Sequence, residues 1–176
     1  MERILYIIPE CYVDTNLIST LVNAAVNHQK SCTKVTETLN KRYSDNFAVG
    51  IIDKDKVEPK YVEEFQEIAA FGHLQLLRHE NRPHYLITIS PAVEMLIIDS
   101  AAEIGLDLKE YGLSSDLNQL KKLTKKVSSN TDNTFTRLFK DLGASSDFSV
   151  LTKTLNYLID NKFKSKEDEL GKIFKG

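Results

Sequence analysis

The chain has 176 residues, of which 41% are hydrophobic and 27% charged, and its formal net charge is −2. This composition excludes a largely disordered chain, and the length is sufficient to bury a core without disulfide bonds. The charge balance excludes the strongly basic character of a nucleic-acid coat protein but leaves room for a local basic face.

Short apolar runs alternate with helical patterns over the first 105 residues. Strands are predicted at 4–8, 47–52, 74–77 and 85–89, the first two as strands buried on both faces. Helices are predicted over 17–26, 33–43, 59–69 and 91–104, with Asp14 or Thr15 as a cap for the first. Strands that alternate with helices predict an α/β fold with a Rossmann-like, mostly parallel sheet.

The pattern changes after Gly105, because strand-like runs almost disappear. Helical stripes of apolar residues follow at 117–123, 135–142 and 150–159, and a charged helix is expected at the end. We therefore expect an α/β domain over 1–105 and a helical extension over 106–176. The extension is either a cover for the sheet or a small second lobe.

Acidic residues follow two of the predicted strands. Glu10 comes after the first strand, and Asp53 and Asp55 come after the strand at 47–52. Ligands of open α/β sheets bind outside the carboxyl ends of the strands, so these acids converge if the two strands are neighbours. Clustered carboxylates repel each other, and Mg²⁺ or Mn²⁺ would relieve that repulsion. The sequence therefore predicts a divalent-cation site at this edge.

Glu94 is a further candidate, because it stands in the otherwise apolar run 92–98 at the start of a predicted helix. Burying a carboxylate is costly unless it is paired, hydrogen-bonded or bound to a metal. One interpretation therefore places Glu94 at the same cation site. The other is a solvent-facing acid stabilised by the helix dipole.

A strand followed by Glu10, a helix, and a strand that ends in Asp53-Lys54-Asp55 resembles the TOPRIM domain of topoisomerases, primases and small nucleases. It is most similar to the short TOPRIM-like domains of the overcoming-lysogenization-defect group and its bacterial defence relatives. The resemblance covers roughly residues 1–104. It implies that Glu10 is the general acid/base or a metal ligand, that Asp53 and Asp55 hold Mg²⁺, and that Glu94 matches a further acid of those relatives.

The sequence departs from that pattern in two ways, so a non-catalytic relative of the family is an alternative interpretation. TOPRIM domains usually place a glycine-bearing strand between the glutamate and the paired aspartates, whereas this interval has a mostly helical pattern. Many also follow the second aspartate with glycine, whereas Lys56 follows here.

Basic residues occur in three places. Arg78 and Arg82, with His79 and His84, lie between two predicted strands and form either a substrate-binding loop beside the cation site or a solvated turn. His28 and Lys30 are either phosphate contacts or part of a polar turn. The lysines of 121–126 form either a solvated helix face or a nucleic-acid contact.

The leading functional hypothesis is Mg²⁺-dependent phosphodiester hydrolysis on nucleic acid, in phage defence or nucleic-acid processing. The alternative is a non-enzymatic interaction module that binds a partner protein. Cys11 and Cys32 are expected to be free thiols, which favours the cytoplasm. No apolar run approaches the roughly 20 residues that a membrane crossing needs, so no membrane association is expected.

Overall fold

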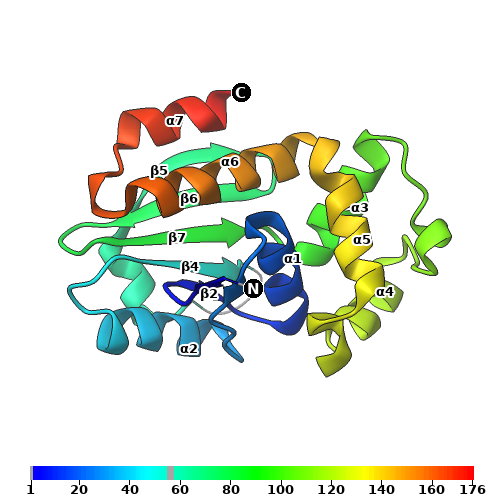
Figure 1. The fold of residues 1–176 in the computed structure, drawn as a ribbon, viewed down its shortest axis with the longest axis horizontal. Coiled ribbons are helices and arrows are strands. Elements are labelled where there is room, and N and C mark those ends of the chain that lie inside the picture. The colour runs from blue at the N-terminus through cyan, green and yellow to red at the C-terminus, as the bar shows by residue number, and fades with distance from the viewer. Residues whose placement is uncertain (1, 55–57) are drawn as a thin grey trace.

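The protein is described by a computed structural model that covers residues 2–54 and 58–176, and its fold is α/β (Figure 1). The strands are β1 (Arg3–Ile4), β2 (Ile7–Pro9), β3 (Ala25–Val26), β4 (Ala48–Asp53), β5 (Phe65–Phe71), β6 (Leu74–His79) and β7 (His84–Ile89). The α-helices are α1 (Tyr12–Val22), α2 (Cys32–Glu37), α3 (Val93–Glu103), α4 (Leu117–Thr124), α5 (Asn133–Asp141), α6 (Ser146–Asn161) and α7 (Glu167–Lys175).

Short turns of π- or 3₁₀-helix connect these elements. They are the π-helical η1 (Thr38–Arg42) and the 3₁₀ turns η2 (Lys60–Glu64), η3 (Leu108–Tyr111), η4 (Val127–Asn130), η5 (Leu142–Ala144) and η6 (Lys162–Lys164). Within the ranges that the structure describes, none of the helices is long and apolar enough to cross a membrane.

The larger sheet has the strand order β2-β4-β7-β6-β5 among the described residues. Its core is parallel, because β4 pairs with β2 on one side and with β7 on the other in the same direction. The hairpin of β5 and β6 adds two antiparallel strands beside β7. The sheet is therefore mixed around a parallel core and is not strictly Rossmann-like. β1 and β3 form a separate small parallel pair.

Helices cover both faces of the sheet. Successive residues of the buried strands point to opposite sides, so both faces present apolar side chains that need cover. In β4, Val49 and Ile51 belong to the cluster formed with α1, α3 and α6, whereas Ala48 and Ile52 pack with α2 and η2. Gly50 allows α2 to approach closely, since a Cβ atom there would lie 2.8 Å from Val35 and 2.7 Å from Leu86. This close packing explains a glycine within an otherwise apolar strand.

The helices that follow Gly105 share the hydrophobic core of the α/β part. Phe139, Phe148 and Leu155 are fully buried in the same cluster as residues of β4 and β7. In Figure 1, α4 and α5 lie at the side toward which the arrows of β4 and β7 point, and α6 crosses above the sheet. The extension therefore covers one face of the sheet and also closes one of its ends.

The structure corrects the prediction of a helix over 59–69. Lys60–Glu64 forms only a 3₁₀ turn, and Phe65–Phe71 is strand β5. The apolar spacing of Val62, Phe65 and Ile68 mimics a helix, because β5 is a partly exposed strand whose pattern is irregular. Pairing with β6, including a register shift between Glu67 and Ala69, overrides that local pattern.

The beginning of the chain differs from expectation in two smaller ways. The predicted strand at 4–8 is divided between β1 and β2, and Ala25 and Val26 form β3 instead of ending the first helix. Asp14 and Thr15 do not cap α1, because the N-cap position belongs to Cys11 and both residues lie in the first turn of the helix.

Candidate functional site

Glu10 and Asp53 lie at the carboxyl edge of the parallel strands. β2 and β4 are neighbours in register, with Pro9 beside Ile51, so the residues that follow both strands emerge together. The Glu10 carboxylate accepts a hydrogen bond from the Asp53 backbone N–H through Oε2, at 3.2 Å. The two strand ends therefore bring Glu10 into contact with the backbone of Asp53. Asp55, predicted to join them, lies outside the described residues.

Glu94 reaches the same place from the first turn of α3. Asp53 Oδ1 accepts a hydrogen bond from the Val93 N–H at 3.2 Å, which joins the end of β4 to the start of α3. Glu94 is 5% exposed and accepts a hydrogen bond from the Thr124 hydroxyl of α4. It therefore faces the acidic cluster and not open solvent.

Asp14, which follows Glu10 in the sequence, adds a fourth carboxylate. It is 1% exposed, and neither carboxylate oxygen has a hydrogen bond of good geometry among the described residues. The pKa of Asp14 is raised to about 7, mainly by burial and to a smaller extent by Glu10 and Glu94, whereas contacts with Cys11 oppose the shift. The Cys11 thiol has a raised pKa for the same main reason, burial, which makes it a poor nucleophile.

A cavity of about 330 Å³ opens over Asp53 and Glu94. Its wall is formed by Cys11, Tyr12, His28, Lys30, Asp53, Glu94, Lys121, Thr124 and Lys125. The volume is at the lower end of the roughly 300–1,000 Å³ found for small-molecule sites. Two carboxylates thus share one hollow with three lysines, and this charge pattern suits a phosphate group bound together with a cation.

The segment after β3 brings His28 and Lys30 to the cavity. Asn27 N–H donates to the Ile7 carbonyl at 2.9 Å, and Gln29 N–H donates to the Pro9 carbonyl at 3.0 Å. These bonds hold the segment along β2 and fix its residues at the carboxyl end of that strand. His28 and Lys30 therefore border the cavity, as the functional interpretation of this segment requires.

Helix α4 and the residue that follows it supply another part of the wall through Lys121, Thr124 and Lys125. Lys122 and Lys126, on the same helix and just after it, border other parts of the surface. The basic run at 121–126 is therefore divided between the cavity and the outer surface. The basic run is evident from the sequence, but the helical spacing of its lysines does not show which of them face the acids.

Tyr12 and His28 form an aromatic pair in the cavity wall. Their ring centroids are 4.6 Å apart, and the planes are stacked at 21°. His28 Nδ1 lies 2.8 Å from the Thr15 hydroxyl, which itself donates to the Cys11 carbonyl. Because Thr15 has only one hydroxyl proton, the imidazole Nδ1 is the donor in this contact. Burial lowers the pKa of His28, so the ring is neutral at pH 7.

Arg78 and Arg82 lie at the opposite end of the sheet. Arg78 is paired with Tyr85 in the register of β6 and β7, whereas Asp53 is beside Ile89. Four residues along β7 correspond to about 13 Å. Arg78 forms an ion pair with Glu167 of α7 at 2.5 Å. The expected substrate-binding loop is therefore not beside the acids, because β6 runs antiparallel to the strands that carry them.

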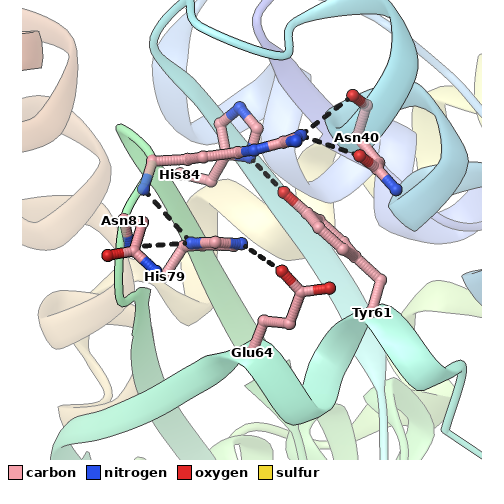
Figure 2. Close-up of polar contacts among 7 residues, drawn as sticks. Asn40, Tyr61, Glu64, His79, Asn81 and His84 are labelled. Carbon is pink, nitrogen blue, oxygen red and sulfur yellow. Dashed lines mark hydrogen bonds and ion pairs between the residues drawn. The ribbon is translucent and has the colours of Figure 1, made fainter.

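Arg82 belongs to a histidine cluster formed with Asn40, Tyr61, Glu64, His79 and His84 (Figure 2). His79 accepts the Asn81 and Arg82 N–H groups at Nδ1 and lies 3.1 Å from Glu64 through Nε2. The Tyr61 hydroxyl is 2.7 Å from His84 Nδ1. Burial lowers the pKa of His84 to about 4. These contacts join the turn between β6 and β7 to η1 and η2, which is a structural role.

A divalent cation at this site would need side chains placed to hold it. Across residues 2–54 and 58–176, no group of three or more His, Cys, Asp and Glu side chains is placed to hold a metal ion. Mg²⁺, however, is usually bound by one or two carboxylates together with waters and substrate phosphates. Asp53 and Glu94 line one cavity and supply that number of carboxylates.

No protein-family model, curated protein or solved structure matches this chain. The functional conclusion therefore depends on the geometry of the site.

Proposed function

We propose that the protein is a TOPRIM-like, Mg²⁺- or Mn²⁺-dependent hydrolase of nucleic-acid phosphodiesters. The observation that carries this proposal is the cavity in which Asp53 and Glu94 lie among Lys30, Lys121 and Lys125. The carboxylates suit a cation, and the lysines suit the phosphate that the cation would help to bind. Phage defence or nucleic-acid processing is the corresponding biological setting.

The residues have distinct roles in this proposal. Asp53 and Glu94 hold the cation, which neutralises charge on the phosphate when it is bound. The lysines orient the phosphate. The attacking water forms a bond to phosphorus and gives its proton to bulk water, while the ester P–O bond breaks and the leaving oxygen takes up a proton from bulk water.

Glu10 acts through Asp53 in this arrangement. It is 1% exposed, it is separate from the residues that line the cavity, and its carboxylate holds the Asp53 backbone. These facts favour a positioning role over the direct acid/base role that the TOPRIM resemblance implies.

The test is hydrolysis of single- and double-stranded DNA and RNA by the purified protein with Mg²⁺ or Mn²⁺. We expect Asp53→Asn to lower the rate by more than about 100-fold, because the amide keeps the bond to Val93 N–H but loses the charge. Asp160→Asn, on the exposed surface of α6, is the matched control and should retain the wild-type rate. Equal rates in wild type and Asp53→Asn would identify a contaminating nuclease and contradict the proposal.

Salt dependence provides a second test, because three lysines border the cavity. Affinity for a single strand should fall about 20-fold between 50 and 200 mM salt. Lys125→Ala should reduce the slope of log affinity against log salt by about 0.7, whereas Lys126→Ala should leave it unchanged. Absence of both hydrolysis and calorimetric metal binding would instead favour the non-enzymatic interaction module that binds a partner protein.

A further inference from the structure

The acids of the site are recessed. Asp53 and Glu94 are only 8% and 5% exposed, and they lie in the wall of a cavity of about 330 Å³ that residues of α1 and α4 also line. A ligand must therefore enter this hollow before its phosphate can approach the carboxylates. A cavity of this volume can hold a small part of a polymeric ligand, but it cannot accept a broad surface of that ligand.

An intact duplex does not match this shape. Proteins that bind duplex DNA do so through roughly 1,000–2,500 Å² of their surface, and the duplex keeps its bases stacked and paired. Enzymes that act in a narrow pocket either use single strands or first unstack and unpair the target nucleotide. A flexible single strand needs no such opening.

The wall of the cavity also has the two features that single-strand binding requires. Such proteins combine basic side chains along the backbone with aromatic side chains on which bases stack. Here Lys30, Lys121 and Lys125 provide the charge, and the stacked rings of Tyr12 and His28 provide the aromatic surface. Burial lowers the pKa of His28, which favours the uncharged form of its ring.

We infer that the substrate is single-stranded nucleic acid, with a base against the Tyr12–His28 pair and its phosphate directed toward Asp53 and Glu94. This inference rests on the proposed function and narrows its substrate class. It also assigns a binding role to Tyr12, which stands at the first position of α1.

The experiment compares a labelled oligothymidylate with the same strand annealed to oligoadenylate. Hydrolysis is measured with Mn²⁺, and affinity is measured with Ca²⁺ in place of the active cation. We expect the single strand to be hydrolysed and bound at least about tenfold better than the duplex, because the duplex must first open. Tyr12→Leu should weaken single-strand binding about tenfold, whereas Tyr12→Phe should retain it.

The outcomes separate the inference from the proposed function. Hydrolysis of the duplex at the same rate as the single strand would overturn the inference and leave the hydrolase standing. Hydrolysis of neither would count against the hydrolase, and equal affinity for both nucleic acids with Ca²⁺ would then overturn the inference independently. If Tyr12→Leu fails to fold, His28→Gln tests the aromatic pair in its place. Tyr111→Leu, which changes an aromatic residue outside the cavity, is the control.

Discussion

Asp14 shows how a single buried carboxylate can tie stability to pH. Its pKa in the folded protein, about 7, is above its ordinary value of 3.8 because the side chain is buried. The folded state therefore keeps this proton over a range in which the unfolded chain has released it. Stability consequently falls as the pH rises from about 4 to 7 and levels off above that range.

We predict that Asp14→Asn stabilises the protein at pH 8. The amide is close in shape to the protonated acid and carries no charge, so it avoids a cost of about 4 kcal/mol. Denaturant unfolding of wild type and variant at pH 5 and pH 8 measures the effect. The gain should be much larger at pH 8, and an equal loss of stability at both pH values would contradict this account of Asp14.

Among the elements, the hairpin of β5 and β6 is attached to α6 at its tip. Gly72 in the turn has a φ of 52°, and the adjacent His73 N–H donates to the Asp147 carboxylate at 3.3 Å. A Cβ atom on Gly72 would lie 2.0 Å from Asp147 Oδ1. The turn therefore needs glycine both for its backbone conformation and for the approach of α6.

We predict that Gly72→Ala lowers the free energy of unfolding by about 1–3 kcal/mol, because it adds backbone strain and displaces Asp147. Gly171→Ala, in α7 with open space around it, should be neutral or slightly stabilising. Both variants are compared by thermal and denaturant unfolding. In an Asp147→Ala background the cost of Gly72→Ala should shrink, and an unchanged cost would show that the contact with α6 has no part in it.

The elements also show what the sequence could predict. β4 and β7 were recognisable because strands covered on both faces are continuously apolar, and α4, α5 and α6 because each has one apolar stripe. β5 was not recognisable, because a partly exposed strand takes its identity from pairing with β6. Local patterns describe an element reliably only where burial is regular.

The residues of the site also divide into those that local sequence predicts and those that depend on tertiary packing. Glu10, Asp53 and Glu94 were identified from their places after strands or at a helix start, which depend on local sequence. The buried state of Asp14 and the inward direction of Lys125 depend on packing between segments more than 100 residues apart. Arg78 and Arg82 were placed beside the acids because the direction of β6 was not apparent from its residues.

At the scale of the whole molecule, the helical extension is part of the core. Asn16 of α1 donates to the carbonyls of Ser129 and Asp132, and Leu151 and Leu158 of α6 are buried with the sheet. We therefore predict that removing residues 145–176 exposes apolar surface and yields a chain of low solubility without cooperative unfolding. Solubility, circular dichroism and light scattering test this.

A shorter truncation provides the comparison. Removal of residues 167–176 deletes only α7, with the buried Leu170 and Phe174, and should leave a folded but less stable protein. If the chain lacking 145–176 stays monomeric and as stable as wild type, the extension is an independent appendage.

The site walls come from five separate parts of the chain: the start of α1, the segment after β3, the end of β4, the start of α3, and the end of α4. During synthesis on the ribosome, the acids and the first lysine emerge well before the helix that encloses them. The nascent chain therefore has no complete cavity until α4 has left the exit tunnel and docked on α3. The proposed hydrolase would therefore be inactive toward nearby nucleic acid until α4 has been synthesised and has docked.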